Sequence, residues 1–144
     1  MKKTRLKLPE IVTDRFLRKI RVCEEELAVF RKLWPRGCRI TEANIYKALE
    51  NDLNVSWFCC KISEVLGLVS RECRDAFMGN LRDLDRVQAS IFDELWKRKK
   101  DKSFGVHVRA VAVQRRRGWK KEAKLEFALL KEAQKGKTLR WPKS

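Results

Sequence analysis

The stretch ISEVLGLVSRECRDAF, residues 62–77, predicts two short helices that meet at a tight turn. Gly67 permits a positive φ in the turn, and Ser70 can cap the second helix, because its hydroxyl accepts a hydrogen bond from a first-turn amide. Two helices that cross steeply must bury their contact. Apolar residues stand at the positions required for this burial: Ile62, Leu66, Leu68, Cys73 and Ala76.

A further helix precedes this corner and completes a three-helix core over residues 40–80. Thr41 is placed to cap a helix that carries Ile45 and Leu49 on one side. The order resembles the helix-turn-helix pattern, whose second helix enters the major groove of DNA. On that interpretation, base edges or phosphates are contacted by Ser70, Arg71, Glu72 and Arg74. The alternative is an ordinary structural corner that touches no nucleic acid.

Residues 1–39 predict a basic tail followed by one amphipathic helix. Apolar residues recur there with alternating spacings of four and three, at Phe16, Ile20, Cys23, Leu27, Phe30 and Trp34. This stripe predicts a single helix of about 20 residues. Pro9 suits its first turn, and Pro35 and Gly37 end it. Its apolar side either packs on the same chain or forms a seam with a second subunit.

Residues 81–133 predict a pair of long helices, so the whole chain is expected to be all-α with a C-terminal helical hairpin. Leu84, Val87, Ile91 and Leu95 line one side of the first helix. The basic stretch KRKKDKSFG, residues 97–105, interrupts the pair. The valines of residues 104–114 permit a strand, but the segment continues into a strongly helical composition, which favours a helix. Residues 134–144 are expected to form a basic tail.

The charge balance points to a polyanionic partner. The 144 residues include 35 Lys and Arg against 19 Asp and Glu, which gives a net charge of +16. Because binding to phosphates releases condensed counterions, we expect a nucleic-acid partner, with duplex DNA favoured over RNA. Cations outnumber acids by 12 to 5 in residues 1–39 and by 19 to 8 in residues 81–144, whereas residues 40–80 hold 4 against 6. The predicted reading helix therefore lies in the one segment that is not basic.

Two basic clusters in the long helical pair are expected to hold phosphates without selecting a sequence. They comprise Lys97, Arg98, Lys99 and Lys100 in the interruption and Arg115, Arg116, Arg117, Lys120 and Lys121 in the second helix. Trp119 stands inside the second cluster. At its spacing it is more often a core residue, and the alternative is stacking on a base.

Catalytic and metal-binding motifs are missing from the sequence. It contains no glycine-rich phosphate loop and no nucleophile elbow, and its one histidine, His107, has no identifiable catalytic partner. The five cysteines include no CxxC pair, so neither a metal nor a cofactor is expected. Their odd number suits a reducing compartment. We therefore expect a protein that is not an enzyme.

Neither membrane insertion nor secretion is expected. No apolar run approaches the roughly 18 to 20 residues that span a bilayer. The basic start MKKTRLKLPE is not followed by the apolar region of a secretory signal. The expected location is intracellular, in the cytoplasm or nucleoid of a host cell.

The three-helix core and the long helical pair together resemble the small terminase subunits of bacteriophages. The stretch LDRVQASIFDELWKRKKDKSFGVHVRAVAVQRRRGW, residues 84–119, is similar in layout to the central helical hairpin of some of them. The resemblance spans roughly residues 40–130 and rests on the order and spacing of the elements. It implies recognition of viral DNA for packaging and assembly into a ring. The helical N-terminal extension and the strong positive charge depart from that pattern.

These features are consistent with two functions. The first is a self-associating DNA-binding protein, such as a packaging adaptor, which requires Arg71 and Arg74 to select a sequence. The second is a structural or assembly protein of a ribonucleoprotein or nucleoprotein complex. Its basic flanks would bind RNA or DNA without sequence specificity, and residues 40–80 would serve only as a helical core.

Overall fold

The computed structural model describes residues 8–97 and 104–135. In these two ranges the chain forms six α-helices, one π-helical segment and a two-stranded antiparallel ribbon, so the predicted all-α class is confirmed. The elements follow in the order β1 (Ile11–Val12), α1 (Asp14–Lys19), α2 (Glu24–Leu33), β2 (Cys38–Arg39), α3 (Glu42–Glu50), α4 (Val55–Cys60), η1 (Lys61–Val65), α5 (Arg71–Lys97) and α6 (Phe104–Lys135).

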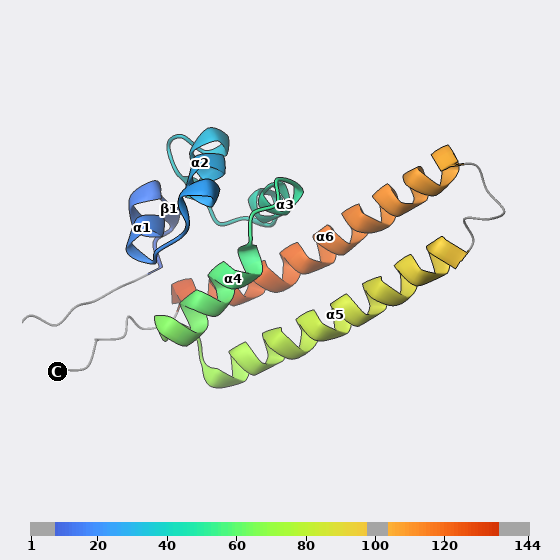
Figure 1. Cartoon of the computed structure of the whole chain (residues 1–144). Helices are drawn as coiled ribbons and strands as arrows, with labels where there is room; N and C mark the ends of the chain where they lie inside the picture. The colour runs from blue at the N-terminus through green and yellow to red at the C-terminus, as the bar shows by residue number, and fades with distance from the viewer. Residues whose placement is uncertain (1–7, 98–103, 136–144) are drawn as a thin grey trace, which may run out of the picture.

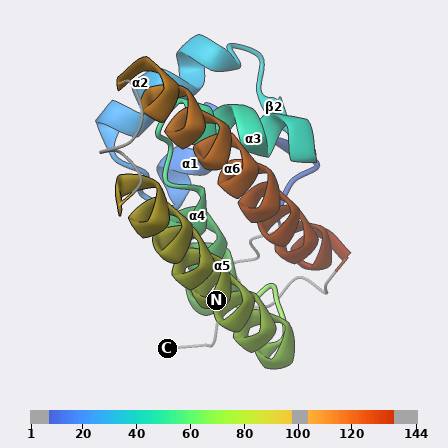
Figure 2. The ribbon, with the colours of Figure 1, turned by 90° about the vertical axis from the view of Figure 1, so that its right-hand side faces the viewer.

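The helices α5 and α6 form the predicted hairpin, and their distal halves extend beyond the part of the chain that contains α1–α4 (Figure 1). α6 packs against α5 along one side and against α3, α4 and η1 along another, as the turned view in Figure 2 also shows. The favoured helix over residues 104–114 is confirmed, because α6 runs without interruption from Phe104 to Lys135. α6 is therefore the helix that connects the two parts of the fold.

Gly118 lies where α5 and α6 approach each other closely. A Cβ atom at this position would stand 3.0 Å from the side-chain Cδ and Oε1 atoms of Gln88. The Nε2 atom of Gln114 donates a hydrogen bond to Gln88 Oε1 across the same contact, with an N···O distance of 3.1 Å. A glycine inside a helix costs about 0.5–1 kcal/mol relative to alanine. Here the contact with Gln88 explains its presence.

The hydrophobic core lies where the N-terminal elements cover the C-terminal half of α6. Among its least exposed side chains are Leu8, Ile20, Leu27, Cys59, Ile62, Leu129 and Leu130. The only buried residue along α5 is Phe77, so α5 is held mainly by partly exposed contacts with α6. Most apolar burial therefore depends on α6 and on the elements before residue 70.

The single N-terminal helix predicted from the apolar stripe is wrong, because the stripe is divided between α1 and α2. α1 ends in a Schellman-type motif in which Arg21 has a positive φ of 65°. The amide of Arg21 donates to the carbonyl of Arg18, and the amide of Val22 donates to that of Leu17. Pro9 does not begin a helix either, since β1 follows it and pairs with β2.

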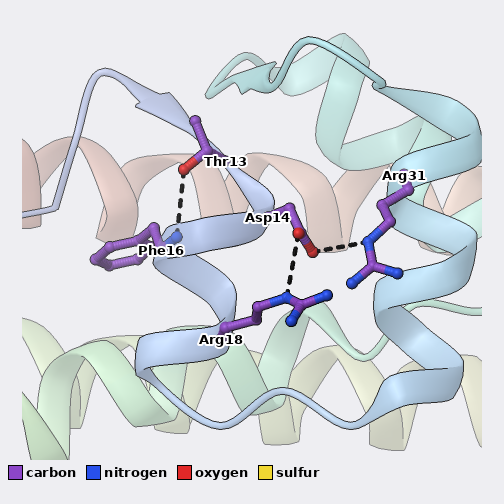
Figure 3. A network of polar contacts seen from close by, with 5 residues as sticks. All are labelled: Thr13, Asp14, Phe16, Arg18 and Arg31. Carbon is purple, nitrogen blue, oxygen red and sulfur yellow. Dashed lines mark hydrogen bonds and ion pairs between the residues drawn. The ribbon is translucent and has the colours of Figure 1, made fainter.

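Polar contacts fix α1 against α2 after this break (Figure 3). The hydroxyl of Thr13 accepts a hydrogen bond from the amide of Phe16 and caps α1. The carboxylate of Asp14 accepts from Nε of Arg18 at 3.2 Å and from Nε of Arg31, on α2, at 2.9 Å. A straight helix over residues 14–33 would separate Asp14 from Arg31 by more than four turns. The two short helices bring them together.

Two predicted helix caps are confirmed. The hydroxyl of Thr41 accepts a hydrogen bond from the amide of Asn44 at the start of α3, and that of Ser70 accepts from the amide of Cys73 at the start of α5. Gly67 has the predicted positive φ, at 62°.

The Ser70 cap gives a first testable expectation. Ser70→Ala should lower the free energy of unfolding by about 1 kcal/mol, since the first turn of α5 loses its side-chain acceptor. Urea denaturation measures this loss. Ser90→Ala, at an exposed position inside α5, is the control and should cause no loss. Equal stability of the two variants would contradict the capping role.

The helix that follows the Gly67 turn is longer than the helix-turn-helix interpretation predicts. α5 continues for 27 residues, so the boundary between residues 80 and 81 falls inside one helix. The boundary between residues 133 and 134 likewise falls inside α6. The expected three-helix unit over residues 40–80 therefore shares its last helix with the hairpin, because the face of α5 that packs on α6 extends past residue 80. The predicted tails lie largely outside the described residues.

Candidate nucleic-acid interface

The candidate reading residues at the start of α5 are occupied by contacts within the protein. Ser70 serves as the helix cap. The carboxylate of Asp75 lies 4.0 Å from Nε of Arg71 and 3.6 Å from a terminal nitrogen of Arg74. Glu72 is exposed beside them. The carboxylate of Asp75 thus lies near both cations, which weakens the local field that would attract phosphate.

The cations of α6 have a different arrangement. Successive residues of an α-helix are rotated by about 100°, so residues three, four or seven apart share a side. Arg116, Lys120 and Lys124 therefore form one row along the helix, and Arg117 and Lys121 form the neighbouring row. Together with Arg109, seven residues before Arg116, they make up what we call the α6 cation face. All six side chains are exposed.

Five of the six cations of the α6 cation face differ from most cations of α5, because they have no described carboxylate beside them. Arg116, Arg117, Lys120, Lys121 and Lys124 form no ion pair within residues 8–97 and 104–135. On α5, by contrast, Arg86 lies 3.7 Å from Asp83. α5 carries five Lys and Arg against six Asp and Glu, whereas α6 carries nine against three. The positive potential of the hairpin is therefore concentrated on α6.

Two residues of the predicted second cluster lie off this face. Arg115 is exposed but is rotated by about 100° from Arg116 and by about 200° from Arg117. Trp119 packs at the edge of the core, where its ring meets that of Tyr46 edge-on with centroids 6.1 Å apart. The core alternative for Trp119 is confirmed, and this side chain is not presented for base stacking.

Sequence reasoning missed Arg109 and Lys124, which the structure places on the α6 cation face. A run of adjacent cations drew attention to residues 115–121, but adjacent residues point in different directions on a helix. The signal that identifies the face is the spacing of seven, four and four from Arg109 through Arg116 and Lys120 to Lys124. This spacing requires that residues 104–135 be helical throughout.

The first predicted phosphate cluster is described only at Lys97. Its ammonium donates a hydrogen bond to Asp93 at 3.1 Å, and this bond and the charge of Asp93 raise the pKa of Lys97 above its usual value. Lys97 thus has a carboxylate partner, as Arg71, Arg74 and Arg86 do. Arg98, Lys99 and Lys100 lie outside the described residues.

A buried carboxyl group lies on the opposite side of α6 from the cation face. Glu126 is 0% exposed, and once protonated its carboxyl group can donate a hydrogen bond to the side chain of Glu122. Burial, reinforced by the nearby Glu122 carboxylate, raises the pKa of Glu126 to about 10. Burial also raises the pKa of Cys59, which faces it. Glu126 is therefore protonated at neutral pH. A neutral carboxyl group does not offset the positive charge of the α6 cation face.

Two further hollows are an apolar cavity and a partly polar groove. A cavity of about 100 Å³ between the N-terminal helices and α6 is lined by Phe30, Trp34, Phe58 and Leu130 among others. A shallow groove between α5 and α6 is lined by the apolar Ile91, Leu95 and Val113 and by the cationic Arg109 and Arg117. Among the described residues, no three side chains of the metal-ligating types converge.

Comparison with models of protein families, with curated proteins and with solved structures finds no match. In the part of the chain that the structure describes, no helix is both long and apolar enough to span a membrane.

Proposed function

We propose that the protein binds nucleic acid, with duplex DNA as the preferred form, through the α6 cation face. The observation that supports this most directly is the contrast between the two hairpin helices. Arg116, Lys120 and Lys124 share an exposed side and have no described carboxylate partner, whereas Arg71, Arg74 and Arg86 are paired. A row of unpaired cations gains most from phosphate, because each contact releases condensed counterions. Affinity would therefore come from α6, not from the start of α5.

Two neighbouring arginines provide a matched test of this proposal. Arg116→Ala should reduce the slope of log K against log salt by about 0.9 for a random DNA duplex, since one phosphate contact is lost. Lys120→Ala should do the same. Arg115→Ala removes the same charge one residue away but off the face, and should change the slope much less. Fluorescence anisotropy across a salt series measures these slopes, and equal effects at positions 115 and 116 would refute the proposal.

Self-association is the second part of the proposed function. Large apolar side chains are exposed on the distal half of the hairpin, away from the α6 cation face: Val87, Trp96 and Val108. Exposed apolar groups gathered on a projecting element mark interaction surfaces more often than isolated ones do. A packaging adaptor requires both an oligomer and DNA binding. An assembly protein that binds nucleic acid without sequence preference requires only the cation face and a helical partner.

Two measurements distinguish these roles: light scattering on the sample used for DNA binding gives the oligomeric state, and selection from a random duplex pool gives the sequence preference. A discrete oligomer that selects particular sequences from a random duplex pool would support the adaptor. Binding with no selected sequence would favour the assembly protein, in agreement with the neutralised arginines at the start of α5. A monomer at all concentrations would refute self-association.

A further inference from the structure

The α6 cation face is wider than a contact with one phosphate strand requires. Arg116 and Lys121 stand at its two edges, about 140° apart around the helix axis, and Arg109 lies near the Arg116 edge. A helix that rests on a single strand needs one row of cations. A helix that lies between two strands needs cations along both edges, because phosphates flank it on both sides.

The side chains between these edges suit contact with base edges. Val113, Lys120 and Lys124 occupy the middle of the arc, and Val113 is 43% exposed. An aliphatic side chain can contact the thymine methyl group, and a lysine can donate to O6 and N7 of guanine. Both kinds of group are presented in the major groove.

We propose that α6, with its cation face inward, lies in the major groove of duplex DNA. This inference rests on the proposed function and specifies its partner. The B-form major groove is about 12 Å wide and admits an α-helix. From Arg109 to Lys124 the face is about 22 Å long at 1.5 Å per residue, which corresponds to the axial rise of about six to seven base pairs. α6, not α5, is then the helix that enters the groove.

The same geometry argues against the other nucleic acids. The major groove of A-form RNA is too deep and narrow to be read by side chains. Single strands are held by aromatic platforms on which bases stack. Between Arg109 and Lys124 the α6 cation face contains no aromatic side chain, since Trp119 is turned toward Tyr46. Phe127, the next aromatic residue, packs partly against the core. Duplex DNA is therefore the form that matches both the width and the chemistry of the face.

Methylation protection tests this placement directly. Dimethyl sulfate methylates guanine N7 in the major groove and adenine N3 in the minor groove. With the full-length protein at saturation on a DNA duplex, we expect protection of guanine N7 and unchanged reaction at adenine N3. We also expect the DNA duplex to bind at least about tenfold more tightly than an RNA duplex of the same sequence. The Arg115→Ala protein should give the same pattern, and Arg116→Ala should weaken the protection.

The outcomes separate this inference from the proposed function. Binding that depends on Arg116 and Lys120 while guanine N7 stays fully reactive, or while both duplexes bind equally, overturns the groove placement and leaves a contact with the phosphate backbone. Absence of salt-dependent binding to either duplex overturns both.

Discussion

Replacing Glu126 with glutamine should remove most of the decline in stability that we expect between pH 5 and pH 8. Glu126 is fully buried. Burial, the charge of Glu122 and a hydrogen bond to the Glu122 side chain together raise the pKa of Glu126 to about 10. In the unfolded chain the same carboxyl group titrates near its usual value of 4.5. Glutamine keeps the shape of the side chain but cannot ionise.

The sign of the effect follows from where the proton is held. Between about pH 4.5 and pH 10 the folded protein retains the proton on Glu126 and the unfolded chain releases it. The free energy of unfolding therefore falls as pH rises through this window, by about 1.4 kcal/mol for each pH unit. From pH 5 to pH 7 the loss is about 3 kcal/mol. Below pH 4.5 both states carry the proton and this contribution to the slope vanishes.

Urea denaturation of the native protein and of Glu126→Gln at several pH values measures the two slopes. Burial also raises the pKa of Glu122, so the variant retains a shallower slope of the same sign. Glu132→Gln, at an exposed position on the same helix, is the matched control and should leave the steep slope unchanged. Parallel slopes for the native protein and Glu126→Gln would show that Glu126 is solvated or paired in solution.

The break between α1 and α2 shows a feature that the periodicity of apolar residues does not predict. The apolar stripe correctly identifies side chains that become buried, such as Phe16, Ile20 and Leu27. It does not reveal the break, because the residue with positive φ is Arg21, whereas glycine is the usual sign of such a helix end. The hydrogen bond that stabilises the broken arrangement joins Asp14 to Arg31, which are 17 residues apart. A contact at that distance leaves no local pattern in the sequence.

The turn at Gly67 illustrates the opposite case. Its positive φ and the Ser70 cap depend on residues within one turn of each other, and both could be predicted. The length of α5 could not, because residues 78–83 are compatible with either a short helix or a continuous one. Packing against α6 decides between them. The run of cations at residues 115–121 was likewise visible in the sequence, but its division between two sides of α6 depends on the helix being unbroken.

Leu130→Ala should lower the free energy of unfolding by about 3 to 5 kcal/mol, the range for truncation of a buried leucine. Leu130 is 2% exposed and lines the apolar cavity of about 100 Å³ between α6 and the N-terminal helices. Truncation would enlarge this existing cavity. The side chains around this cavity do not fill it even in the native protein. We therefore expect that they will not move to fill the additional space. The loss would be a large part of the stability of a domain of this size.

Val113→Ala is the control, since it shortens an exposed side chain on the same helix and should change stability by less than about 0.5 kcal/mol. Chemical denaturation at one fixed pH measures both variants. A loss below about 1 kcal/mol for Leu130→Ala would contradict the packing of α6 on the N-terminal elements. If the predicted loss is observed, the folded fraction of Leu130→Ala should still show the native salt dependence of DNA binding, because Leu130 faces the core and the proposed phosphate contacts lie on the exposed side of α6. Separate effects on stability and on salt dependence would then show that one helix supports the core and the nucleic-acid interface with different faces.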